Sequence, residues 1–247
     1  MAAQTIQEVI DQLQDIIDQS KENESPLGYF AALYQKVTIT IKNKLGTNYF
    51  DDDERMEKLD VVFANRYIDA YNAYQNNLKP TQSWIKAFQE SKNKKLIVLQ
   101  HLMLGMNAHI NLDLGIAAAA ITTQDTIGAL EDDFNKINEV LGGLVDNVQN
   151  DLIEINPILF WILKSFKKVD DLLIDFSMNI ARDGAWKFAN ELSNSNSKEN
   201  LILERDNKIA ALTKLIIHQP LLINIVFRLL RWNEKGSVSE KIEKLVT

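Results

Sequence analysis

Apolar residues recur at steps of three and four along almost the whole chain, which is the spacing of one face of an α-helix. The first such stretch includes Ile6, Val9, Leu13 and Ile17, and Thr5 stands before it as a suitable N-cap residue. Helical spacing returns after each break that contains proline, glycine or several asparagines. Further helices are predicted at residues 27–45, 51–74, 83–89, 94–121, 130–148, 152–163, 169–192, 201–217, from 220 onward, and 238–246, with Pro157 marking a break or a first turn.

Residues 37–41 alternate between β-branched apolar residues and threonine, so they fit a strand as well as a helix. Both flanks keep helical spacing and no partner strand is found nearby, so we predict a helix here too. Nine glycines and four prolines in 247 residues are few for an all-β or doubly wound α/β protein. Ser193–Ser197 is the most loop-like stretch, but it is too short for an interdomain linker. The expected fold is all-α: a single domain over residues 1–247, built as a multi-helix bundle around a buried central helix at about 94–121.

The amino-acid composition limits the kinds of molecule that the protein is expected to bind. There are 27 basic and 34 acidic side chains, giving a formal charge of −7, and such a surface weakly repels phosphate backbones and anionic lipid. No long basic run marks a nucleic-acid site. The absence of cysteine excludes disulfides, thiolate metal ligands and cysteine nucleophiles. The first 18 residues carry no basic side chain, and no apolar run approaches the roughly 20 residues of a membrane span, so we expect a soluble cytoplasmic protein without a signal peptide or membrane span.

The central helix is apolar on every side and yet carries polar residues. A helix that is apolar all round is normally buried. Even so, Gln100–Ala120 contains His109 and Asp113, four residues apart on one face, and Asn107 and Asn111 on roughly the opposite face. Buried polar groups must find partners, since an unpaired one costs about 1–3 kcal/mol. The pattern therefore predicts a polar network that reaches neighbouring helices. An aspartate beside a histidine raises the basicity of the imidazole and fixes its tautomer, which suits either a general base or a structural bridge.

Two glycines flank this polar face of the central helix. Gly105 lies one turn before His109, and Gly115 follows Asp113. Each glycine lowers helix stability by roughly 0.5–1 kcal/mol relative to alanine. Such a cost is tolerable where another backbone or a ligand must come close.

The segment Gly105–Leu114 closely resembles the signature of domain of unknown function 5995, an uncharacterised and mainly bacterial family. Other segments are similar to an N-terminal helix, an upstream motif, a proline–tryptophan turn and a later arginine–tryptophan helix of the same family. They lie at residues 29–38, 59–67, 80–84 and 181–186, so that the resemblance spans roughly residues 5–220. The resemblance implies a helical domain, and it brings no established activity and no assigned catalytic residues.

Three interpretations of the His109–Asp113 pair remain open. In the first, the pair belongs to a structural network in the core, and the aromatic residues at helical spacing are ordinary core. In the second, it lies in a small-molecule pocket in which His109 acts as acid or base and Asp113 orients it. Helices that begin near Asp51 and Val169 would then surround the central helix and supply the further polar groups and the walls. The candidate ligand-binding residues are Asp60, Arg66, Tyr67, Trp84, Asn107, Asn111, Arg182 and Trp186.

The third interpretation is a metal site, because His109 and Asp113 at this spacing could ligate one ion. The Glu-x-x-His pairs of di-iron bundles are missing, however, and the chain has only three histidines. His218, beside Gln219 and Pro220, is expected to interact with the dipole at a helix C-terminus. A metal is therefore the lesser alternative, and no cofactor is predicted.

Other catalytic signatures are missing from the sequence. A Gly-rich phosphate loop, a Gly-x-Ser-x-Gly elbow and a His-Glu-x-x-His motif are all lacking, which argues against a standard nucleotide-binding enzyme or serine hydrolase. The favoured hypothesis is binding or conversion of a small, partly apolar molecule near His109. The alternative is a non-catalytic scaffold or interaction module. Its working surface would be the apolar stripe of the C-terminal helix, which would equally fit core or a dimer contact: Leu221, Leu222, Ile225, Val226, Leu229 and Leu230.

Overall fold

The computed structural model describes residues 1–165 and 178–246, and the regular structure in these ranges is helical, which confirms the predicted all-α class. The helices of the described ranges are α1 (Ile6–Glu22), α2 (Leu27–Lys42), α3 (Asp53–Gln75), α4 (Gln82–Gln89), α5 (Val98–Ala108), α6 (Leu114–Ile121), α7 (Glu131–Ile155), α8 (Ile158–Ser165), α10 (Met178–Ser193), α11 (Lys198–Ile217), α12 (Leu221–Asn233) and α13 (Val238–Val246). No helix in these ranges has the length and apolarity needed to cross a bilayer.

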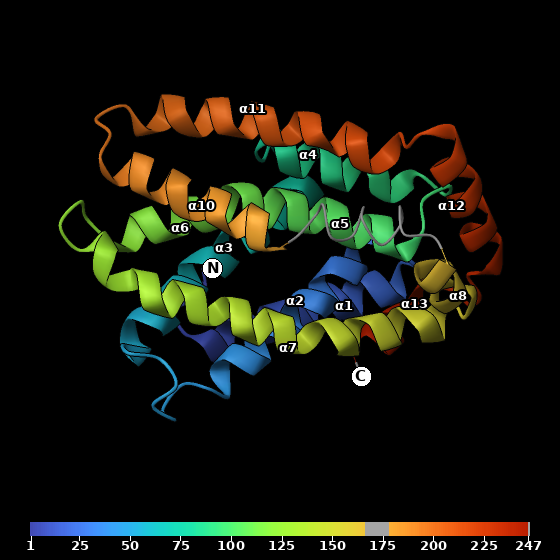
Figure 1. The fold of residues 1–247 in the computed structure, drawn as a ribbon, viewed down its shortest axis with the longest axis horizontal. Helices are drawn as coiled ribbons and strands as arrows, with labels where there is room; N and C mark the ends of the chain where they lie inside the picture. Colours follow the sequence, from blue (N-terminus) through green and yellow to red (C-terminus); the bar gives the residue numbers. More distant parts are fainter. Residues whose placement is uncertain (166–177, 247) are drawn as a thin grey trace.

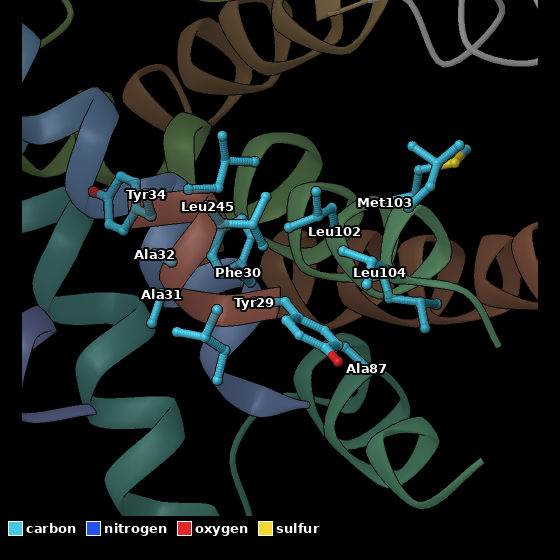
Figure 2. Packing of buried hydrophobic residues seen from close by; sticks show 14 of the residues in the cluster. Tyr29, Phe30, Ala31, Ala32, Tyr34, Ala87, Leu102, Met103, Leu104 and Leu245 are labelled. Carbon is cyan, nitrogen blue, oxygen red and sulfur yellow. The ribbon is translucent and has the colours of Figure 1, made fainter. Parts of the chain in front are cut away.

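The two helices α5 and α6 run end to end through the middle of the bundle (Figure 1). Helix α6 packs against α10 and α3, whereas α5 packs against α11, α2 and α4. Figure 2 shows Phe30 and Tyr34 of α2 in the same packed cluster as Leu102 and Leu104 of α5. The predicted buried central helix is therefore present, and neighbouring helices cover it.

The central helix contains an irregular turn that its periodicity does not predict. Residues His109–Asp113 form a π-turn between α5 and α6, in which the Leu114 N–H donates to the His109 carbonyl five residues back. A π-turn inserts one residue into an α-helix, and such turns often occur at functional sites. The turn contains both residues of the predicted polar pair.

The helix boundaries differ from the predicted ones in one informative place. The sequence leaves residues 149–151 between two predicted helices, but α7 continues through them to Ile155. The chain breaks at Asn156–Pro157, where Pro157 predicts a break or a first turn. Gln149 and Asn150 are exposed, and Asp151 pairs with Lys36 of α2 at 2.8 Å. These polar residues form the outer face of a helix rather than a turn. Residues 37–41 are helical as predicted, and residues 169–177 of the predicted 169–192 helix lie outside the described residues.

Carboxylates from distant helices accept hydrogen bonds from the backbone at several helix starts. Asp206 of α11 accepts from the N–H groups of Gln82 and Ser83 at 2.6 and 2.8 Å. Glu234, next to α12, accepts from the Val98 N–H at 2.8 Å. A negative charge at a helix N-terminus also interacts favourably with the helix dipole. These contacts fix where α4 and α5 begin, and thereby position the side chains that α4 directs inward.

Both glycines of the central helix lie where another element comes close. A Cβ at Gly115 would lie 2.9 Å from the Ala185 carbonyl oxygen of α10, and a Cβ at Gly105 would overlap the Phe30 ring of α2. The expected close approach is therefore made by a backbone at Gly115 and by an aromatic side chain at Gly105. Phe30 is one of the rings that surround His109, so Gly105 helps to shape that region.

Candidate functional site

Asp113 lies at the centre of a hydrogen-bond network built from three elements. Its carboxylate is fully buried. Arg66 of α3 donates from Nε to Oδ1 at 2.7 Å, and Trp84 of α4 donates from Nε1 to Oδ2 at 2.7 Å. His109 Nδ1 lies 3.3 Å from Oδ2 within the π-turn. The structure thus brings together four of the residues named from the sequence.

The electrostatics of this network assign a protonation state to each member of the His109–Asp113 pair. Burial alone would raise the pKa of Asp113, but the Arg66 guanidinium and then His109 and Trp84 outweigh it, so that the pKa lies below its ordinary value. Burial and, to a smaller extent, Arg66 lower the pKa of His109 and Asp113 raises it, with the net result that the pKa lies below its ordinary value. At neutral pH the carboxylate is therefore ionised and the imidazole neutral. Because Nδ1 faces a carboxylate, the single N–H proton of the neutral imidazole lies on Nδ1, and Nε2 carries a lone pair.

Aromatic rings enclose the imidazole of His109. Phe63 stacks on it with ring centroids 3.6 Å apart and planes 7° apart, and Tyr34 meets it edge-on at 4.5 Å. Phe30, Trp84 and Tyr67 lie further out, at 5.7, 6.0 and 6.1 Å. From the sequence, Tyr67 and Trp84 were expected to line a pocket, whereas Phe30, Tyr34 and Phe63 were not. All three lie in the segments that resemble the family, so the resemblance could have pointed to them.

Several buried polar atoms around this cluster have no hydrogen-bond partner among the described residues: His109 Nε2, Tyr34 Oη, Tyr67 Oη and Asp60 Oδ2. Burial, then the charges of Asp60 and Asp113, raises the pKa of Tyr34, so both carboxylates act on that hydroxyl. Burial, then Glu57, raises the pKa of Asp60 to about 7. Buried polar groups in native proteins are nearly always paired. The region therefore combines an apolar lining with unused hydrogen-bonding capacity.

The side chains of Phe63 and Arg66 lie between this region and solvent. They are one helical turn apart on α3, and both are partly exposed. Phe63 covers one face of the His109 ring, whereas Arg66 holds Asp113. Phe63 is thus a partly exposed ring in direct contact with the buried imidazole.

The remaining candidate residues have contacts elsewhere. Asn107 accepts from Asn111 at 3.2 Å and donates to the Ile209 carbonyl of α11 at 3.0 Å, on the opposite face of the central helix. Arg182 donates to the Phe134 carbonyl of α7 at 3.0 Å, and the Trp186 ring lies 4.9 Å from the Phe134 ring. These contacts join the two residues to Phe134 of α7. A role for them in ligand binding stays a prediction.

A surface groove between α2 and α7 is separate from the His109 region. Its volume is about 490 Å³, and Lys36 and Asp151 line it as an ion pair. The α2 residues along it lie on roughly the opposite side of that helix from Tyr34. Within the described ranges, no three histidine, aspartate or glutamate side chains are grouped to hold a metal ion.

A family model matches most of the chain. It covers residues 6–219 and is described as a family of unknown function, DUF5995. No curated protein and no solved structure matches the chain. The matched stretch includes every residue of the His109 network and ends just before α12. The chain belongs to this family of unknown function, DUF5995.

Proposed function

We propose that the aromatic-lined interior around His109 binds a small, partly apolar molecule by accepting a hydrogen bond from it at Nε2. The observation that carries the proposal is the asymmetry of the imidazole. Nδ1 faces Asp113, whereas the buried Nε2 has no partner in the described part of the chain. A lone pair held in that position suits a hydroxyl or N–H group of a ligand.

The same arrangement would give the imidazole a capacity for proton transfer. Asp113 fixes the tautomer and stabilises the imidazolium that forms when Nε2 takes a proton. Arg66 and Trp84 hold Asp113 in place with 2.7 Å hydrogen bonds. A histidine oriented in this way can act as a base towards a bound hydroxyl or water.

The groups near the His109 ring support a class of ligand. The hydroxyls of Tyr34 and Tyr67 supply donors, and Asp60, with a pKa raised by burial and Glu57 to about 7, can be protonated near neutral pH. The rings of Phe30, Phe63 and Trp84 supply apolar area. A flat apolar molecule with one or two hydroxyl groups fits this combination, whereas a strongly anionic one would meet Asp60 and Asp113.

Nitrogen-15 NMR of histidine-labelled protein tests the expected protonation state and tautomer of His109. The chain has three histidines, so the substitution His218→Gln, at an exposed position, assigns one signal without touching the site. We expect His109 to be neutral at pH 7 with its proton on Nδ1. An imidazole protonated on Nε2 would overturn the proposal, because the lone pair offered to the ligand would be gone.

Titration with phenol and toluene tests the proposed hydrogen bond from a ligand to Nε2, since the two molecules differ by a hydroxyl in place of a methyl. A hydrogen bond worth about 1 kcal/mol corresponds to roughly fivefold tighter binding of phenol. We expect phenol to shift the His109 signals, and we expect this preference to vanish in His109→Leu. His218→Gln should keep it. Equal binding of phenol and toluene by the wild type would favour the structural interpretation of the network.

A further inference from the structure

Helix α12 carries apolar residues on two faces, of which one is turned outward. Val226 and Leu230 are buried in the bundle. Leu221, Ile225, Leu229 and Trp232 are exposed, with 77% of Leu221 and 86% of Trp232 accessible. Their spacing of four, four and three residues places them along one side of the helix. The apolar stripe expected from the sequence therefore divides into a core face and a face that is exposed in the described structure.

The neighbouring helix α8 extends this apolar area. Phe160 and Trp161 are exposed, whereas Leu159 and Ile162 are buried. Asn156, at the start of α8, donates to the Leu230 carbonyl of α12 at 2.8 Å, and the two helices pack against each other. Figure 1 shows both at the same end of the bundle. We refer to Leu221, Ile225, Leu229, Trp232, Phe160 and Trp161 together as the end surface.

The charge around the end surface differs from that of the whole chain. The chain has 34 acidic residues in 247, but residues 207–233 contain none and residues 155–165 contain none. Glu234, the acid that follows α12, is buried and bound to the Val98 N–H, with Arg231 and Lys241 beside it. Arg228 is exposed and lies on the same side of α12 as the apolar stripe. In the described part of the chain, the end surface is therefore apolar and carries the positive charge of Arg228, on a protein of net charge −7.

We propose that the end surface docks onto an anionic lipid bilayer and lies in its interface without crossing it. A helix that combines leucine and tryptophan on one side with arginine and no acidic residue has the properties of interfacial membrane helices. Tryptophan favours the boundary between headgroups and acyl chains. Charge complementarity decides between lipid and a second copy of the chain. A symmetric dimer would set Arg228 near its own copy, whereas an anionic surface would neutralise it.

Vesicle binding of the full chain tests this proposal. The probes are vesicles of phosphatidylcholine alone and vesicles with about a third phosphatidylserine, and the readouts are co-sedimentation and the emission wavelength of tryptophan. We expect at least tenfold tighter binding to the anionic vesicles and a loss of this preference at high salt. Absence of binding to either type of vesicle would overturn the proposal.

Single substitutions test whether the end surface is the part of the protein that contacts the bilayer. We expect Trp232→Glu and Leu221→Glu each to weaken binding to anionic vesicles at least tenfold, and Arg228→Glu to remove the preference for anionic lipid. Leu78→Glu is the matched control, because Leu78 is also an exposed leucine, 66% accessible, but lies in the turn after α3. Circular dichroism checks that each variant is folded. An equal loss in Leu78→Glu would contradict the assignment. So would a wild-type dimer in sedimentation velocity that Trp232→Glu dissociates, since the surface would then bind a second copy.

Discussion

Two buried carboxylates, Asp113 and Asp206, act on the same helix in different ways. Asp206 takes its hydrogen bonds from backbone N–H groups at the start of α4. Asp113 takes its hydrogen bonds from side chains, including Trp84 of that same helix. Backbone donors are present whatever the sequence of α4, whereas the donors to Asp113 require an arginine, a tryptophan and a histidine on three elements.

The difference separates a structural carboxylate from one that also orients a titratable group. Asp206 satisfies a helix end, which is a sufficient reason for its burial. Asp113 stabilises the fold as well, but in doing so it fixes the tautomer of His109 and leaves Nε2 available. Substituting each residue and measuring the free energy of unfolding therefore tests whether the two carboxylates, which differ in their hydrogen-bond donors, also differ in how much they stabilise the fold.

The largest effect is expected for Asp113→Asn. The change leaves Arg66 without its charged partner and replaces an acceptor of Trp84 and His109 by an amide. Breaking a buried ion pair costs about 3–5 kcal/mol, and we expect about 3 because Arg66, whose side chain is 29% exposed, regains some water. Urea unfolding measures the change, with Asp69→Asn on the exposed face of α3 as control. A loss below that of Asp206→Ala would contradict the comparison.

The second-largest effect on the free energy of unfolding is expected for Asp60→Asn. Asp60 is a buried carboxylate whose Oδ2 has no hydrogen-bond partner within the described residues. Burial, then Glu57, raises its pKa from 3.8 to about 7, so the protonated form favours the folded state. The wild type therefore loses stability as pH rises from about 4 to 7, and Asp60→Asn does not. We expect the variant to gain about 2–3 kcal/mol relative to wild type between pH 5 and pH 8. Unfolding at both pH values measures this, and a pH-independent difference would refute the shifted pKa.

The smallest effect is expected for Asp206→Ala. The substitution removes the acceptor of two backbone N–H groups, and loss of such a cap typically costs about 1–2 kcal/mol. Glu204→Ala, on the exposed side of α11, is the matched control. We further expect the NMR signals of His109 to stay at their wild-type positions in Asp206→Ala and to move in Asp113→Asn. Movement in both variants would mean that the start of α4 governs the imidazole as well.

Much of this architecture could be predicted because helical spacing is a strong signal. The buried central helix and the His109–Asp113 pair followed from apolar residues on every side and a four-residue interval. The π-turn could not be predicted, since one inserted residue leaves the apolar pattern unbroken. The gap left at residues 149–151 between two predicted helices was wrong because polar residues on an exposed helix face resemble those of a turn.

The direction of individual side chains was harder to predict than the helices. Arg66 and Trp84 contact Asp113, but the contacts of Arg182 and Trp186 lead to Phe134 of α7. Residue type alone does not say which neighbour a helix face will meet. Tyr34 and Phe63 were missed for a related reason, because an aromatic residue at helical spacing fits ordinary core equally well. Only their distances to His109 distinguish them.

The extra residue in the π-turn has a consequence for how the gene can change. A π-turn takes up its extra residue in one widened turn, so deleting one codon between 109 and 113 would let a regular α-helix form without rotating the segment that follows. Gly115 would still face the Ala185 carbonyl, but His109 and Asp113 would then be separated by three residues instead of four, and their contact with each other would change. Selection should therefore act on the spacing of this stretch as strongly as on its chemistry, so that insertions and deletions are rejected even where substitutions are accepted.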